Sequence, residues 1–327
     1  MSKYYTFVGE IDGNIYHRYI ENGERHIDIV KMYPYEIFLK DLNGEYNSLY
    51  DEKLKRYEFD TISELKKFIY EAGRDNVYGN TSPVQQFIAS EYPDEIKMSE
   101  LLYTIFNFDL EVEHENNFPN PKDAINEILS VSYEIRVGKG LSKKYYMGTI
   151  PYTGDDKETE TMVLNDEREL IQKLIDVIHE CQPDFMTNWY GDFFDIPYLV
   201  HRSLKVLGKE KTNMISPFGK YSKKCISENK FAPFLSFNIF GITNLDYMEL
   251  YKKYSPDKQE SYRLDHIAEV ELGENKIKFP EYKNNLMNLY LGRYDIAPET
   301  PKETLNEKDR WCRLRTILKN KLDISYL

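Results

Sequence analysis

Residues 106–113, with the sequence FNFDLEVE, restrict the fold of this chain more than any other segment. Apolar and polar residues alternate there with a period of two, which is typical of a β-strand with one buried face and one polar face. Asp109 and Glu111 share the polar face, about 6–7 Å apart along the strand at a rise of ~3.3 Å per residue. The segment therefore predicts a sheet with carboxylates on one face and a core on the other.

The segments on either side of this strand predict the class of the domain that contains it. Three successive strands are followed by a helix, a buried strand and a second helix, which indicates an α/β domain around a mixed sheet. The first helix has apolar residues at helical spacing, and Asp166 with Glu169 resembles a capping box at its start. The strands are expected at 102–112, 126–137, 143–150 and 184–189, and the helices at 166–181 and 196–207.

The first hundred residues predict a smaller, mixed α+β domain. Short strands are expected at 4–8, 14–20, 25–30 and 34–39. The dipeptides Asp12-Gly13 and Asn22-Gly23 are typical of hairpin turns between such strands. A helix is expected at 61–72, with Thr61 as its N-cap and Gly73 at its end. Nothing catalytic is visible in this part, so a scaffold or binding role is the default interpretation.

Composition excludes several classes of protein. A length of 327 residues corresponds to about two domains. The chain has 43 Lys and Arg against 55 Asp and Glu, a net charge of −12, whereas simple nucleic-acid coat proteins are usually basic. Three cysteines are too few for a disulfide framework or a zinc site, and no apolar run approaches the ~18 residues of a membrane span. We therefore expect a cytoplasmic globular protein without a membrane partner.

Asp195 is a second acidic position that changes the interpretation of the Asp-x-Glu strand. It follows the predicted buried strand and precedes a helix, where Asp is a favoured N-cap. The same carboxylate, at the mouth of a sheet, can also point toward Asp109 and Glu111. Carboxylate oxygens are the ligands that Mg²⁺ and Mn²⁺ prefer. A solvated acidic face is the alternative, and for an isolated Asp-x-Glu pattern it is the usual one.

Five segments in order carry a family resemblance: FDLEVE, NFPNPKDAI, TNWYGDFFDIPYLVHR, FGITNLDYMELYKKYS and SYRLDHIAEVEL. Together they resemble the exonuclease domain of family-B DNA polymerases, particularly those of T-even-type phages. Asp109 and Glu111 match the first exonuclease motif, Asp-x-Glu, and Asp195 matches the Phe-Asp of the second. The resemblance covers about residues 1–290 and implies an N-terminal domain at 1–100 and an exonuclease domain at 101–290. The last stretch, 291–327, departs from it, and its own pattern predicts a charged helical tail.

The resemblance also implies an activity and a cofactor. It implies a ribonuclease-H-like fold that carries out 3′→5′ proofreading hydrolysis of single-stranded DNA or of a frayed primer 3′ end. Two divalent ions, Mg²⁺ or Mn²⁺, would activate a water and stabilise the leaving 3′-oxygen. Asp109 would bridge both ions, Glu111 would bind the ion that activates water, and Asp195 would support the second ion. A phage-encoded chain would act in the host cytoplasm.

Aromatic and basic residues near these motifs are candidates for nucleic-acid binding. Phe118 matches the position where the family places a Phe against the terminal bases, and Phe194 directly precedes Asp195. Exposed aromatic rings can stack on unpaired bases. Lys220, Lys223 and Lys224 would contact a phosphate backbone, which lysine does without sequence preference. Ordinary loop packing of Phe118 and a solvated lysine loop are the alternatives.

Two departures from the family pattern stand out. Tyr190 occupies the position five residues before Asp195 where the second motif usually carries Asn. The third motif, Tyr-x-x-x-Asp on a helix, is not found after Leu272. The nearest acidic candidate for a metal ligand is Asp295, which directly follows Tyr294. Because Pro298 would interrupt a regular helix there, a surface or turn position for Asp295 is the alternative.

These observations leave two hypotheses. In the first, the chain is a 3′→5′ exonuclease that forms one piece of a split polymerase, with palm, fingers and thumb on a second polymerase chain; these 327 residues alone would not polymerise DNA. In the second, the chain is a catalytically impaired nucleic-acid-binding or scaffold subunit. Binding of RNA is a further possibility that the resemblance raises.

Overall fold

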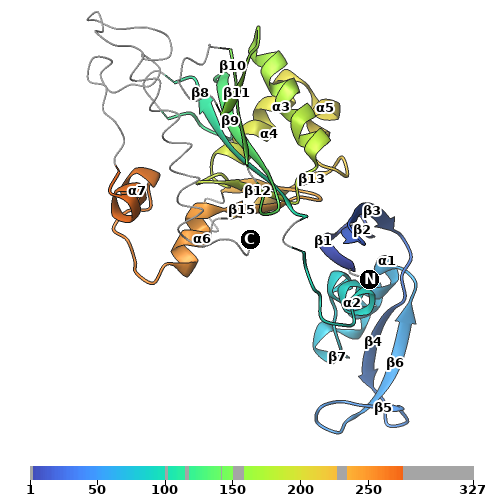
Figure 1. Cartoon of the computed structure of the whole chain (residues 1–327). Helices are drawn as coiled ribbons and strands as arrows, with labels where there is room; N and C mark the ends of the chain where they lie inside the picture. The colour runs from blue at the N-terminus through green and yellow to red at the C-terminus, as the bar shows by residue number, and fades with distance from the viewer. Residues whose placement is uncertain are drawn as a thin grey trace, which may run out of the picture. The chain divides into compact units, whose positions relative to one another are not determined.

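The computed structural model describes residues 3–99, 102–114, 118–140, 142–149, 158–226 and 234–274. The chain divides into two compact units, Met1–Ser99 and Glu100–Leu327 (Figure 1). The tail predicted at 291–327 and its candidate ligand Asp295 lie outside the described residues, so both stay predictions. None of the described helices is long and apolar enough to cross a membrane.

The N-terminal unit begins with a three-stranded antiparallel sheet. Its strands are β1 (Lys3–Ile11), β2 (Asn14–Glu21) and β3 (Glu24–Val30), in that order across the sheet. Asp12 and Gly13 both have positive φ angles, of 52° and 73°, and Asn22 and Gly23 repeat the pattern. Two consecutive residues with positive φ form the tight turns that match strand twist, and these residue types adopt that conformation most readily. The predicted hairpins are confirmed.

The rest of the N-terminal unit combines a second sheet with two helices. Helix α1 (Ile62–Ala72) is capped by the Thr61 hydroxyl, which accepts from the Glu64 N–H at 3.2 Å, and it ends at Gly73 with φ of 80°. Both cap residues are as predicted. A separate core of buried apolar residues joins these elements to the first sheet. The remaining elements are β4 (Tyr35–Lys40), β5 (Tyr46–Asn47), β6 (Lys53–Phe59), the 3₁₀ turn η1 (Arg74–Asn76), β7 (Val77–Tyr78) and α2 (Pro83–Glu91).

The second unit is built on a six-stranded sheet in the order β11-β10-β9-β8-β12-β15. Strands β8 and β9, and β9 and β10, are antiparallel, whereas β10–β11, β8–β12 and β12–β15 are parallel. The sheet is therefore mixed, as predicted. Its strands are β8 (Thr104–Val112), β9 (Ile128–Val137), β10 (Lys143–Gly148), β11 (Thr159–Val163), β12 (Phe185–Asn188) and β15 (Thr243–Asp246).

Helices α3 (Glu167–Cys181), α4 (Asp195–Val206) and α5 (Lys209–Asn213) pack on one face of this sheet (Figure 1). Phe106, Phe108 and Leu110 of β8 belong to the core that these helices cover. Because side chains alternate along a strand, Asp109 and Glu111 face away from that core. The alternation in the sequence thus predicted which face of β8 is buried.

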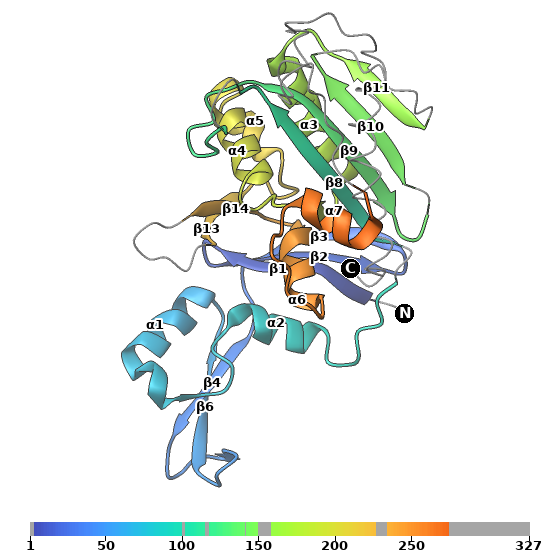
Figure 2. The ribbon, with the colours of Figure 1, turned by 90° about the vertical axis from the view of Figure 1, so that its left-hand side faces the viewer.

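Two smaller assemblies complete the described part of this unit. Strands β13 (Tyr221–Cys225) and β14 (Leu235–Ile239) form an antiparallel hairpin. Helices α6 (Tyr247–Tyr254) and α7 (Leu264–Leu272) pack together around a second buried cluster that includes Trp189 (Figure 2). The Trp189 indole N–H donates to the Tyr262 carbonyl at 3.2 Å, which ties the segment after β12 to the start of α7.

Candidate functional site

The acidic face of β8 carries two of the predicted site residues. Asp109 and Glu111 are half-buried. Asp109 lies opposite Ser132 of β9, which lies opposite Tyr146 of β10, so these three residues form a row on one face of the sheet. The two carboxylates therefore share their face of the sheet with small or hydroxyl-bearing residues, since Glu111 lies opposite Ser130 and Ser130 lies opposite Gly148.

Tyr146 lies in the same row as Asp109, and the sequence reasoning did not single it out. Its side chain is 4% exposed, and burial together with the nearby charge of Glu111 raises the pKa of Tyr146 to about 12. Gly148 makes room for it, because a Cβ atom at that position would lie 2.5 Å from the Tyr146 hydroxyl. A neutral phenol beside Glu111 can donate a hydrogen bond at physiological pH. Gly148, two residues after Tyr146, was the one signal in the sequence that a large side chain is accommodated here. The register between β9 and β10, which brings Tyr146 to the same face as Asp109, could not be derived from the sequence.

Asp195 approaches β8 beyond the end of β12. Strand β12 pairs with β8 only as far as Asn107, so the backbone of β8 beyond that residue has no strand partner on this side. The Asp195 carboxylate, which is 3% exposed, takes that place and accepts a hydrogen bond from the Leu110 N–H at 3.1 Å. Leu110 lies between Asp109 and Glu111, so the structure brings Asp195 to the backbone between the other two predicted carboxylates.

This arrangement has the right donor chemistry for a hard cation, but the three side chains do not form a closed ligand set. Within the residues that the structure describes, no group of three or more His, Cys, Asp or Glu side chains is arranged to hold a metal ion. Carboxylate oxygens from Asp109 and Glu111 share one strand face and suit Mg²⁺ or Mn²⁺. The metal-binding role of the three residues therefore stays a prediction.

The two predicted base-stacking residues lie together. The rings of Phe118 and Phe194 are 4.8 Å apart, and Phe194 also contacts Tyr198 within α4. Phe118 is 73% exposed, which is high for a phenylalanine and leaves most of its ring accessible. The exposed Phe118 ring thus packs against the residue that precedes Asp195, and its role in stacking on a nucleic-acid end stays a prediction.

The three predicted lysines differ in their surroundings. Lys224 on β13 is paired with Asp192 at 2.8 Å, and Asp192 also accepts from the Asn244 amide at 2.8 Å. The charge of Lys224 therefore serves first to hold the β13–β14 hairpin against the segment that precedes α4. Lys223 is exposed on the same strand, and Lys220 is half-buried just before it. Phosphate binding by these residues stays a prediction.

Asp246 organises the segment that leads to Asp195, and sequence reasoning missed it. Its Oδ1 accepts from the N–H groups of Tyr190 at 3.0 Å and Met248 at 2.9 Å, and its Oδ2 accepts from Asp192 N–H at 3.2 Å. Burial raises the pKa of Asp246, while these backbone hydrogen bonds oppose the shift. An Asp before a predicted helix signals an N-cap, but its contact with residues 190 and 192 depends on the pairing of β12 with β15.

Tyr190 adopts an unusual backbone conformation in this segment. Its φ angle is 68°, in the left-handed region that disfavours side chains other than Gly, Asn and Asp. Its ring stacks on Phe193 at 4.8 Å and is 44% exposed. Strain of this kind persists only where neighbouring contacts fix it, here the hydrogen bond to Asp246 and the aromatic stack.

Comparisons with known proteins find sequence similarity over most of the chain. The family model described as "DNA polymerase family B, exonuclease domain" matches residues 55–267, which is more than half of the chain. The DNA-directed DNA polymerase of Escherichia phage RB69 is 26% identical over 311 residues, 85% of this chain and 34% of the relative. That of Enterobacteria phage T4 is 24% identical over 320 residues, 90% of this chain and 35% of the relative.

More distant viral proteins match a shorter stretch. The DNA polymerase of Autographa californica nuclear polyhedrosis virus is 27% identical over 202 residues, 58% of this chain and 20% of the relative. The chain thus spans about a third of the length of the phage relatives and less of this viral one. In these three relatives the similarity covers more than half of this chain and at most 35% of the relative.

Proposed function

Because the chain belongs to the exonuclease-domain family of family-B DNA polymerases, we propose that it removes nucleotides from DNA 3′ ends by metal-dependent hydrolysis. The substrate would be single-stranded DNA or a frayed primer end. The mixed sheet with helices on one face supports the ribonuclease-H-like fold that this activity requires.

The observation that carries the proposal is the hydrogen bond from the Leu110 N–H to Asp195. It fixes a carboxylate from α4 at the stretch of β8 whose polar face carries Asp109 and Glu111. These three residues would hold two divalent ions, which supply an activated water and stabilise the leaving 3′-oxygen. Neutralising three like charges favours their closer approach, so cation binding and assembly of the site are coupled.

Residues around the carboxylates would bind the DNA end. The exposed ring of Phe118, supported by Phe194, would stack on an unpaired terminal base. Lys223 and Lys220 would contact the phosphate backbone, with Lys224 holding the hairpin that carries Lys223. Tyr146, whose hydroxyl is hydrogen-bonded to Ser130 near the Glu111 charge, would help to set the position of Glu111.

The test is hydrolysis of a single-stranded oligonucleotide by the purified chain in the presence of Mg²⁺ or Mn²⁺. We expect shortening from the 3′ end only, loss of activity with EDTA, and loss in the Asp109→Ala and Asp195→Asn variants. Glu160→Gln is the matched control, because Glu160 is an exposed carboxylate at the far edge of the same sheet, on β11. Equal activity in Asp195→Asn and Glu160→Gln would refute the assignment.

A second candidate function is nucleic-acid binding without hydrolysis, as a scaffold subunit. It is favoured by the absence, among the described residues, of a three-residue metal-ligand group. In that case salt-dependent DNA binding would persist in Asp109→Ala while no preparation hydrolyses DNA. A second polymerase chain and binding of RNA stay predictions. Adding a candidate polymerase chain, or replacing the DNA oligonucleotide by RNA, in the same hydrolysis and binding assays tests each of them.

A further inference from the structure

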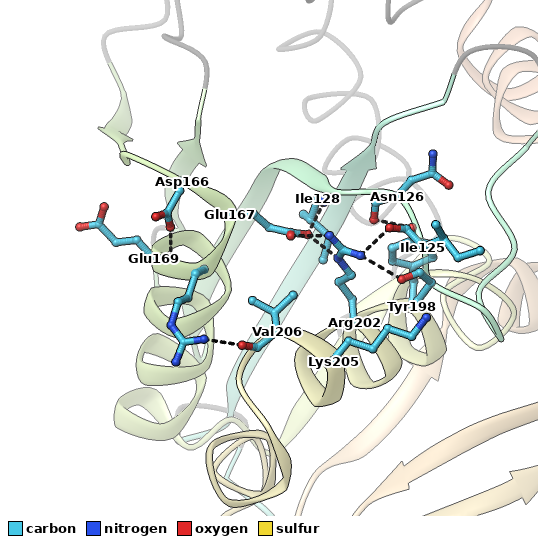
Figure 3. Close-up of polar contacts among 12 residues, drawn as sticks. Ile125, Asn126, Ile128, Asp166, Glu167, Glu169, Tyr198, Arg202, Lys205 and Val206 are labelled. Atoms are coloured by element: carbon cyan, nitrogen blue, oxygen red, sulfur yellow. Dashed lines mark hydrogen bonds and ion pairs between the residues drawn. The ribbon is translucent and has the colours of Figure 1, made fainter.

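Helix α4 carries a row of side chains that all hold one loop. Tyr198, His201, Arg202 and Lys205 are spaced at i, i+3, i+4 and i+7, which places them on one face of the helix. Their partners are backbone carbonyls of residues 121–126. Tyr198 donates to Asn126, and Arg202 donates to Ala124 and Ile125 (Figure 3). His201 contacts Pro121 at 2.7 Å, and Lys205 donates to Asp123. One helix face therefore fixes the backbone of this loop at several points.

Arg202 is the centre of this row because it is also paired with Glu167 at the start of α3. Arg202 Nε and Nη2 donate to the two carboxylate oxygens of Glu167 at 2.8 and 2.7 Å, and Glu167 Oε1 also accepts from the Ile128 N–H at 2.7 Å (Figure 3). The side chains of Arg202 and Glu167 are only 12% and 8% exposed. A buried two-point pair of this kind fixes both partners in one orientation.

The loop that this pair holds is strained. Ala124 has a φ of 38° and is fully buried, although the left-handed region is unfavourable for alanine. The Ala124 N–H donates to Asn120 at 2.8 Å, and its carbonyl accepts from Arg202 at 3.2 Å. Strained backbone persists where the surroundings over-determine it, and it clusters at functional sites.

This loop follows Phe118 directly in the chain, and the helix that holds the loop, α4, begins with Asp195. The position of the loop therefore affects where Phe118 lies relative to Asp195. Phe118 itself contacts Phe194, the residue before Asp195. The same helix therefore sets both the place of the exposed ring and the place of the carboxylate. We propose that Arg202, paired with Glu167, is a positioning residue that fixes the Phe118 loop relative to Asp195, so that a stacked 3′-terminal nucleotide lies in register with the carboxylates. This inference rests on the proposed function, in which Phe118 binds the DNA end.

Arg202→Lys is the informative variant, because lysine keeps the positive charge but cannot make the two-point contact or reach several carbonyls. We expect the 118–127 loop to loosen and single-stranded DNA to bind about tenfold more weakly, in the range of one lost base–aromatic stack. Arg168→Lys is the matched control, because Arg168 lies on α3 and donates to the Val206 carbonyl at the end of α4 without contacting the loop.

The decisive experiment is a double-mutant cycle on DNA binding, measured by fluorescence anisotropy with a single-stranded oligonucleotide in EDTA, where no metal-dependent hydrolysis occurs. If Arg202 acts through Phe118, then Arg202→Lys weakens binding in the wild-type background but not in Phe118→Ala. Hydrogen exchange of the Ile128 amide should also accelerate in Arg202→Lys and stay unchanged in Arg168→Lys.

The outcomes separate this inference from the proposed function. Coupled binding effects without hydrolysis would refute the nuclease and support the positioning role. Independent effects of Arg202→Lys and Phe118→Ala, or equal effects of Arg202→Lys and Arg168→Lys, would overturn the positioning role even if the chain hydrolyses DNA. Absence of measurable DNA binding by the wild-type chain would overturn it as well.

Discussion

Replacing Asp246 removes the acceptor for three backbone N–H groups around the segment that leads to Asp195. In Asp246→Ala, helix α6 loses its N-cap, which costs about 1 kcal/mol. The N–H groups of Tyr190 and Asp192 also lose their partner, and for partly buried donors we take about 1 kcal/mol each. The variant should therefore lose about 3 kcal/mol of unfolding free energy.

Asp246→Asn separates the two oxygens of this carboxylate. Oδ1 serves both Tyr190 and Met248, whereas Oδ2 serves Asp192 alone. An amide that keeps its oxygen at the Oδ1 position retains two contacts and turns its NH₂ group toward the Asp192 N–H. The expected loss is therefore about 1–2 kcal/mol, smaller than for alanine.

Urea unfolding followed by tryptophan fluorescence measures these differences, since Trp189 is buried in the second unit, close in sequence to Tyr190 and Asp192. Burial raises the pKa of Asp246, so the folded state keeps this proton to higher pH than the unfolded state does. Its contribution to stability accordingly falls as pH rises above the usual Asp range, and Asp246→Asn should flatten that slope. Equal losses in Ala and Asn, or a loss below about 0.5 kcal/mol in Ala, would refute the reasoning.

Three further predictions concern other parts of the molecule. Burial lowers the pKa of His17 to about 4, so the stability that the neutral ring provides is lost as pH falls from about 6.5 toward 4. The loss in unfolding free energy should reach about 3 kcal/mol. Unfolding followed by circular dichroism should show this loss in the wild type and not in His17→Gln. Tyr146→Phe should keep the fold but raise the metal concentration for half-maximal hydrolysis about tenfold; an unchanged metal titration would remove Tyr146 from the site. Gly191→Ala should cost about 1–3 kcal/mol, because its Cβ would lie 1.8 Å from the Asn188 side chain; adding Asn188→Ala should restore most of that loss, and failure to do so would contradict the steric cause.

Features that depend on local sequence were predictable. The alternation around Asp109 fixes which residues of β8 face the core, because side chains in a strand alternate whatever the partner strand is. Asp12-Gly13 and Asn22-Gly23 form the predicted turns for an equally local reason, since those residues readily adopt positive φ. Helix α2, in contrast, carries local signals that were not used: Ser82 is its N-cap and Pro83 its first residue.

Features that depend on pairing between distant segments were not predictable. Asp246 and Tyr190 are 56 residues apart and meet because β15 lies parallel to β12. The Asp192–Lys224 ion pair joins residues 32 apart, and it gives Lys224 a structural partner that the basic cluster in the sequence does not reveal. Such contacts follow from strand order, which a single sequence does not specify.

The loop that carries Phe118 shows the same division. Its aromatic residue and the Phe194 ring were both identified from motifs, and the structure places them in contact. The Arg202–Glu167 pair that holds the loop was invisible, because a charged residue on a helix is usually solvated and only the packing of α3 beside α4 buries this pair. The contacts of this site that the sequence did not predict are therefore mainly those of charged residues that tertiary packing buries.

The central claim, that Asp195, Asp109 and Glu111 act together at β8, is tested most directly by 3′-end hydrolysis in the Asp195→Asn variant. The measurement is the initial rate on a 5′-labelled single-stranded oligonucleotide at saturating Mn²⁺, with wild type and Glu160→Gln alongside. Asparagine keeps an oxygen that can accept from the Leu110 N–H, so the fold should persist while the negative charge is lost. The account predicts a rate at least about a hundredfold below wild type. A folded Asp195→Asn variant that hydrolyses DNA at the wild-type rate would contradict it.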